Sequence, residues 1–187
     1  MMKITFIRHS KVLFNWGKTY NADSFDLACQ AYDLSPVQEG EKMGIGRQSV
    51  YISNLIRTGA TAKNLLQEDI EIIKTDLLNE IPLKAFINTK MPLPTIIWMV
   101  LGRLQWYFNN SNQLETRKNS IERINKFLDH ILGKGEDCII IGHGFYFAQM
   151  VNQMKSRAIN GDMRKRIKNE ELRVFVADNV FENKAIN

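Results

Sequence analysis

The chain has 187 residues, of which 44% are apolar and 24% charged, a balance that fits one globular domain and excludes a disordered polypeptide. The formal net charge is +5, and much of that excess lies in residues 155–173, where Glu170 and Glu171 interrupt it. No nucleic-acid-binding motif accompanies this stretch, so we expect a solvated basic face and no nucleic-acid partner.

The cysteines and the most apolar stretch bear on the compartment. Cys29 and Cys138 are far apart and lack CxxC or zinc-type spacing, which favours free thiols in a reducing, cytoplasmic compartment. Basic residues break up the N-terminal apolar run, so no signal peptide is expected. Residues 91–108 are interrupted by prolines and polar groups, which argues against a membrane span.

Apolar runs and helical periodicities alternate along the chain. Residues 9–35 lack periodicity and read as loop. Strands are predicted at 3–8, 50–52, 70–75, 138–142 and 172–176, the last at a sheet edge. Helices are predicted at 36–47, 58–66, 94–108, 114–132 and 145–154. This order predicts a single domain over 1–187, an α/β fold with three α/β/α layers around a central, mostly parallel mixed sheet.

Residues 82–113 form the least regular part of this plan. The helix predicted at 94–108 is apolar nearly all round, which is typical of a buried helix or of one at an interface. Burial in the core is the simpler interpretation. The alternatives are a cap that shapes the substrate pocket, with Phe86, Trp98 and Trp106 as candidate walls, or a homodimer contact.

Polar side chains follow two of the predicted strands. The run at 3–8 ends on Arg8-His9-Ser10, and the run at 138–142 ends on Gly142-His143-Gly144. Ligands of open α/β sheets bind beyond the carboxyl ends of the strands, so both imidazoles are expected in one cleft. The third histidine, His130, lies in the last turn of an amphipathic helix and is interpreted as structural.

Arg57 and Glu80 complete a set that suits phosphoryl transfer. A neutral imidazole can accept the phosphoryl group, and guanidinium forks bind its oxygens. A carboxyl group can protonate the leaving oxygen and then activate water. No His, Cys or carboxylate cluster has metal-ligand spacing, so neither a metal nor a cofactor is expected.

Four blocks, in order, resemble the histidine phosphatase superfamily, the phosphoglycerate mutase-like proteins. They are Arg8-His9-Ser10 with Asn15 six residues past the histidine, the segment 53–62 with sequence SNLIRTGATA, Leu78-Asn79-Glu80, and Gly142-His143-Gly144. Any one block alone would be weak, whereas four in the family order are specific.

The resemblance implies a role for each matching residue. His9 would be the phosphate-accepting nucleophile and Glu80 the proton donor, with Arg8, Arg57 and His143 also catalytic. The phosphate would be bound by Arg8, Ser10, Asn15, Arg57, His143 and Gly144. The family fold is a central mixed sheet flanked by helices.

Two departures from the family pattern shape the functional expectation. Ser10 replaces the usual glycine, and the segment after Glu80 lacks the longer basic, proline-rich insert of the mutases. We therefore expect a metal-independent phosphatase that hydrolyses small phosphomonoesters through a phosphohistidine. The alternatives are a phosphohistidine-protein phosphatase with a phosphoprotein substrate, a non-catalytic phosphate-binding regulator and, less favoured, a phosphoglycerate mutase.

Overall fold

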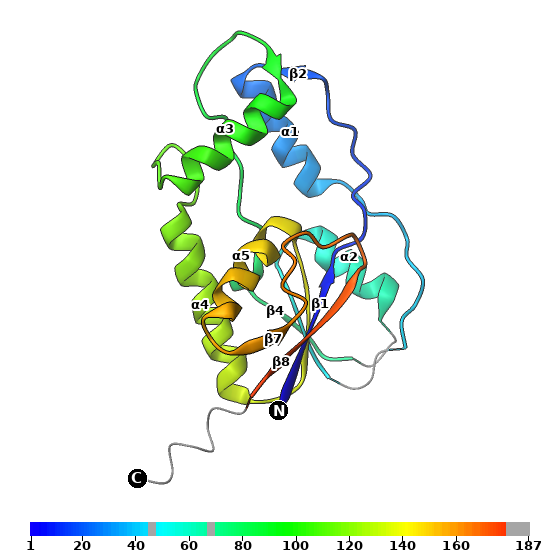
Figure 1. Ribbon diagram of the computed structural model, residues 1–187. Helices are drawn as coiled ribbons and strands as arrows, with labels where there is room; N and C mark the ends of the chain where they lie inside the picture. The colour runs from blue at the N-terminus through cyan, green and yellow to red at the C-terminus, as the bar shows by residue number, and fades with distance from the viewer. Residues whose placement is uncertain (45–47, 67–69, 179–187) are drawn as a thin grey trace.

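A six-stranded mixed sheet forms the centre of the molecule (Figure 1). The computed structural model describes residues 1–44, 48–66 and 70–178. The strand order is β4-β3-β6-β1-β8-β7. The strands are β1 (Met2–Arg8), β3 (Ser49–Ile52), β4 (Ile72–Lys74), β6 (Cys138–Gly142), β7 (Ile159–Gly161) and β8 (Leu172–Ala177). The five predicted strands are therefore present, and β7 was not predicted.

Four neighbouring strands are parallel, and their carboxyl ends lie at one edge of the sheet. β6 pairs in parallel with both β1 and β3, and β3 pairs in parallel with β4. β8 pairs antiparallel with β1 and with β7. The prediction of β8 as the edge strand was wrong, because β7 lies outside it.

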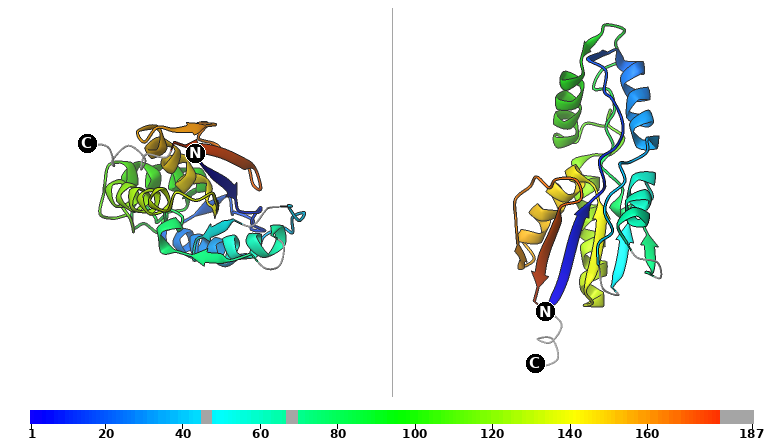
Figure 2. Two further views of the ribbon diagram at one scale, coloured as in Figure 1. Left: turned by 90° about the horizontal axis from the view of Figure 1, so that it is seen from below. Right: turned by 90° about the vertical axis from the view of Figure 1, so that its right-hand side faces the viewer.

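Helices cover the sheet on two faces (Figure 2). The helices α4 (Arg117–Lys134) and α5 (Gly144–Lys155) pack on one face, and α2 (Ile56–Leu65) packs on the other. The side chains of β6 alternate between these layers, since Cys138 and Ile140 belong to the first core and Ile139 and Ile141 to the second. This alternation explains why the strand reads as a continuous apolar run. The predicted three-layer α/β architecture is confirmed.

Residues 9–44 differ from the prediction. A helix, α1 (Ala22–Leu34), begins at a capping box in which Asn21 and Ser24 bond each other's backbone N–H. The helix predicted at 36–47 is absent over 36–44, and residues 45–47 lie outside the described part. Instead, the chain after Ser35 pairs with the segment beyond β1, where Leu13 N–H donates to Pro36 O at 2.8 Å and Gln38 N–H to Lys11 O at 2.8 Å.

Beyond the carboxyl ends of the parallel strands, α1 and α3 (Thr95–Tyr107) stand side by side (Figures 1 and 2). The short strands β2 (Thr19–Tyr20) and β5 (Leu93–Pro94) pair at the tip of this lobe. Its small core stacks Phe25 on Trp98, with ring centroids 5.5 Å apart. α3 is not buried all round: Trp98, Gly102 and Trp106 face inward, whereas Ile96, Val100, Leu104, Tyr107 and Phe108 are exposed.

Candidate active site

The sheet register brings the two predicted histidines together. Arg8 lies opposite Gly142 in the β1–β6 ladder, and the N–H of His9 donates to Gly142 O at 3.0 Å. The next residue of each strand is therefore a histidine, and the His9 and His143 ring centroids are 5.2 Å apart. Both side chains are almost fully buried.

One hydrogen bond determines which nitrogen of His9 can react. The ring Nδ1 lies 2.8 Å from Ser10 O, and a carbonyl oxygen only accepts, so the proton is on Nδ1. Burial is the main cause that lowers the pKa of His9 to about 3; the hydrogen bond to Ser10 O opposes this shift, and the nearby Arg57 and Arg8 charges add to it. His9 is thus a neutral imidazole whose Nε2 carries a free lone pair.

His143 is held between the second sequence block and its own strand. Arg57 Nε–H donates to His143 Nδ1 at 3.1 Å, so the ring proton is on Nε2, which donates to Ser53 Oγ at 2.8 Å. Burial, with Arg57 as the next cause, holds the pKa of His143 well below its usual value. Both histidines are therefore neutral.

Two buried polar atoms beside His9 lack a hydrogen-bond partner within the described residues: Arg8 Nε and Ser10 Oγ. The other end of the Arg8 guanidinium is held, since Nη1 donates to Ile167 O at 2.9 Å. A Cβ on Gly144 would lie 3.0 Å from both Cζ and Nε of Arg8, so a larger residue there would displace the guanidinium. Unpaired buried donors are rare, and an anion would satisfy them.

Ser10 fits its position without the glycine that the family pattern has there. The positive-φ residues other than glycine in the described chain are Asn109, Ala158 and Glu170, so Ser10 is not strained. Its N–H donates to Thr61 Oγ1 at 2.9 Å, and its side chain is fully buried.

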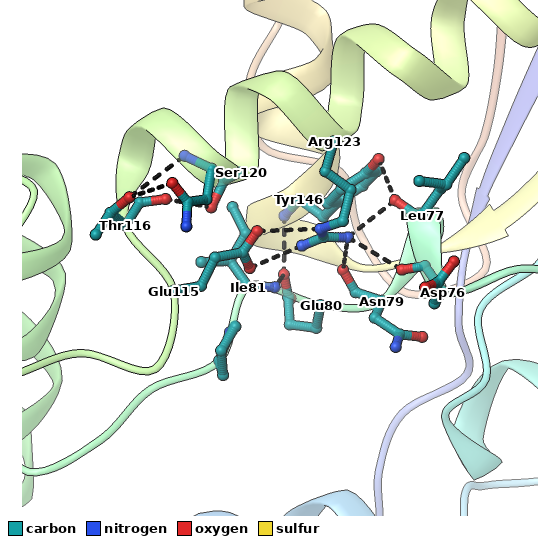
Figure 3. Close-up of polar contacts among 12 residues, drawn as sticks. Asp76, Leu77, Asn79, Glu80, Ile81, Glu115, Thr116, Ser120, Arg123 and Tyr146 are labelled. Carbon is teal, nitrogen blue, oxygen red and sulfur yellow. Dashed lines mark hydrogen bonds and ion pairs between the residues drawn. The ribbon is translucent and has the colours of Figure 1, made fainter. Parts of the chain in front are cut away.

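Glu80 lies at the N-terminus of α5, directly beyond His143. Its Oε1 accepts the N–H of Tyr146 at 2.9 Å and of Ile81 at 2.9 Å, and its Oε2 accepts the N–H of Phe145 at 3.4 Å (Figure 3). Amide donors and the helix dipole stabilise a carboxylate here. The simpler interpretation of Glu80 is therefore a helix cap, and the functional one is a carboxyl group that gives and takes a proton during the reaction.

Two arginine side chains donate hydrogen bonds to backbone carbonyls on either side of Glu80. Arg123 Nη1 donates to Leu77 O at 2.8 Å and Asn79 O at 2.7 Å, and the same side chain forms a bidentate pair with Glu115 (Figure 3). Arg103 Nη1 donates to Ile81 O at 3.0 Å and to Pro82 O at 3.1 Å. The position of the carboxylate is thus fixed by α3 and α4.

A cavity of about 860 Å³ is lined by both Arg57 and Glu80, whereas His9 and His143 are not among its lining residues. Its aromatic lining residues are Trp16 and Tyr32. Phe86, Trp98 and Trp106 do not line it, so their assignment as pocket walls was wrong: both indoles are buried, and their Nε1–H groups donate to Tyr20 O and to Ser120 Oγ. Asn15 is exposed and lies outside this lining.

Sequence reasoning missed four polar residues of the site: Ser53, Asp33, Arg103 and Arg123. Ser53 opens the second block and was given no role, although a hydroxyl at that fixed place was a usable signal. Asp33 pairs with Arg57 Nη1 at 2.6 Å from a helix that was read as loop. Nothing in the local sequence around Arg103 or Arg123 indicates that their partners are backbone carbonyls.

The described part of the chain offers neither a metal-ligand cluster nor a membrane-spanning helix. It contains no group of three His, Cys, Asp or Glu side chains that could hold a metal ion. Among its helices, none combines the length and apolarity needed to cross a membrane.

A mixed sheet with two neutral histidines facing each other at its carboxyl edge defines a phosphoglycerate mutase-like α/β protein. The sequence profile of the histidine phosphatase superfamily (branch 1) matches residues 38–180, which include the last three blocks and follow the first. The chain belongs to this superfamily, as its motifs indicated.

Solved structures agree on the fold. Phosphoglycerate mutase from Bacillus anthracis has a TM-score of 0.61 at 14% identity, covering 96% of this chain and 92% of that chain. The alpha-ribazole phosphatase from Shigella flexneri has a TM-score of 0.57 at 14% identity, covering 92% and 89%. No curated protein sequence matches the chain. At these identities the likeness concerns the fold.

Proposed function

We propose that the chain is a metal-independent phosphatase that hydrolyses small phosphomonoesters through a phosphohistidine on His9. The observation that carries the proposal is the free Nε2 lone pair of a neutral, buried His9 beside the two unpaired polar atoms, Arg8 Nε and Ser10 Oγ. A nucleophile and a site that can bind an anion are the two parts that phosphoryl transfer needs.

The reaction would occur in two displacements. In the first, His9 Nε2 bonds to phosphorus, the ester oxygen departs, and Glu80 in its protonated form gives that oxygen a proton. In the second, Glu80 as carboxylate takes a proton from water, the water oxygen bonds to phosphorus, and His9 Nε2 departs. Arg8 and Arg57 would neutralise the charge on the phosphoryl oxygens throughout.

The cavity favours a small molecule over a phosphoprotein. It lies under the lobe formed by α1 and α3, and its lining combines Trp16 and Tyr32 with aliphatic side chains such as Leu83 and Met99. Such a lining suits a phosphomonoester with an apolar or aromatic organic part. We propose that residues 82–113, together with α1, act as the cap that shapes this pocket.

The test is a hydrolysis screen over phosphorylated metabolites, aryl phosphates and phosphohistidine peptides, run in EDTA. Turnover of small esters with the chelator present is expected, because the proposed chemistry uses side chains alone. Turnover that stops in EDTA and returns with magnesium would contradict the mechanism. Selective turnover of phosphohistidine peptides would favour the protein phosphatase, and vanadate binding without turnover would favour the regulator.

A further inference from the structure

The cap helix α1 carries a carboxylate to the phosphate-binding arginine. Asp33 Oδ1 accepts from Arg57 Nη1 at 2.6 Å, and the guanidinium also lies 5.3 Å from the Tyr32 ring centroid. The Arg57 side chain is 2% exposed, whereas that of Asp33 is 48% exposed and lines the cavity. Arg57 and Asp33 line the same cavity, so a ligand whose phosphate binds Arg57 can place its organic part beside the Asp33 carboxylate.

Helical spacing places further polar groups on the same face of α1. Asp26, Cys29, Gln30 and Asp33 follow the i, i+3, i+4, i+7 pattern, and all four line the cavity. Asp26 is engaged by the backbone, since its Oδ1 accepts the N–H of Ala85 at 2.6 Å. The electrostatic potential at this face of α1 is negative. The pKa of the Cys29 thiol is raised to about 12, mainly by burial and then by the charges of Asp26 and Asp33.

Most of the basic side chains that line the cavity already form hydrogen bonds or ion pairs with other groups of the protein. Arg103 and Arg123 donate to backbone carbonyls, and Arg123 also pairs with Glu115. Arg57 is shared between Asp33 and His143. Lys84 also lines the cavity and is the cation that could receive an anionic group of a ligand.

We propose that Asp33 is a specificity-determining residue, which disfavours phosphomonoesters whose organic part carries a second anionic group, such as a carboxylate or another phosphate. The inference rests on the proposed function for where the phosphate binds. An anion in the cavity is repelled by the Asp33 carboxylate, although the half-exposed side chain and its pairing with Arg57 keep this repulsion modest. The preferred substrates are esters with a neutral or cationic organic part.

The experiment measures, by calorimetry, dissociation constants of phenylphosphonate and 4-carboxyphenylphosphonate, which stand for the corresponding phosphate esters because their P–C bond is not hydrolysed. The wild-type protein is expected to bind the neutral-ring compound more tightly, and Asp33→Asn is expected to narrow the ratio of the two dissociation constants by about two- to fivefold, as for one partly exposed charge. Asp23→Asn is the matched control, because it removes another ion-paired aspartate of α1 whose partner is the exposed Lys90. It should leave the ratio unchanged.

Each outcome decides the assignment. If the ratio of dissociation constants is unchanged in Asp33→Asn, the assignment of Asp33 is overturned. A wild-type preference for the carboxylate-bearing ligand also overturns it and points to Lys84. If the carboxylate-bearing ligand binds only to Asp33→Asn, the assignment is supported. If neither protein binds either ligand, both this inference and the proposed function are overturned. Affinity and turnover are measured separately. A charge preference in binding without any hydrolysis would therefore contradict the proposed phosphatase activity but not the role of Asp33. Thermal unfolding shows whether each variant is folded.

Discussion

Arg57 Nε–H donates to His143 Nδ1 at 3.1 Å, joining side chains that are 86 residues apart in the sequence. The bond makes His143 a neutral acceptor on one side and directs its Nε2–H to Ser53. A guanidinium beside an imidazolium would be repulsive, so this contact and the neutral state of His143 support each other. Three of the four sequence blocks thus meet at the pair formed by His9 and His143.

His9 is expected to form a covalent phosphoenzyme. Incubation with a labelled phosphomonoester, followed by an alkaline quench, should leave acid-labile label on His9, and His9→Ala should lose both the label and turnover by orders of magnitude. His130→Ala is the control, since His130 is exposed on α4. If the label persists in His9→Ala, His9 is not the residue that accepts the phosphoryl group.

The buried neutral histidines predict a loss of stability in acid. Between its ordinary pKa of 6.5 and its folded pKa of about 3, His9 binds a proton only when the chain is unfolded. The unfolding free energy should therefore fall as pH decreases through this range, by about 2 kcal/mol from pH 7 to 5 for this one group. His143 contributes in the same direction.

Urea unfolding of the wild type and of His9→Gln at pH 7 and 5 measures this term. The variant should show a drop smaller by about 2 kcal/mol, whereas His130→Gln should show the wild-type drop. Equal drops in the wild type and His9→Gln would mean that His9 is not buried in its neutral form.

The fold was largely predictable because parallel strands leave a strong signal. All five residues of β6 are buried, so their side chains are apolar on both faces and the run is unmistakable. α1 was missed because its buried stripe is only Ala22, Phe25 and Ala28, and the Asn21–Ser24 capping box looks like a turn. The region after Ser35 was misread because its long-range pairing with residues 11–13 is invisible locally.

The site was predictable only where residues follow strands. His9 and His143 come together because their strands pair in register. Asp33, Arg103 and Arg123 reach the site from helices, and their partners lie roughly 20 to 50 residues away in sequence. No local pattern encodes such contacts, so these residues required the tertiary structure.

Glu80 should discriminate between leaving groups. Glu80→Gln keeps the shape and an acceptor oxygen for the α5 amides but cannot transfer a proton. Hydrolysis of a sugar phosphate should slow by about 10²–10⁴-fold, and hydrolysis of an activated aryl phosphate much less. Vanadate affinity should be nearly unchanged. If both esters lose activity equally, or neither does, Glu80 is a helix cap and not the general acid.

Arg123→Lys should disturb the same function from a distance. Lysine keeps the charge but cannot reproduce the planar fork that holds Leu77 O, Asn79 O and the Glu115 carboxylate together. We expect the free energy of unfolding to fall by about 1–3 kcal/mol.

The loop that carries Glu80 should also become less ordered in Arg123→Lys. Hydrolysis of the sugar phosphate should then slow more than hydrolysis of the aryl phosphate. This is the same direction as for Glu80→Gln, but the factor should be smaller, about tenfold. Arg117→Lys is the matched control on α4, since its guanidinium lies over the Tyr107 ring. A loss of stability in Arg123→Lys without any change in the ratio of the two substrates would show that Arg123 supports the fold and does not position Glu80.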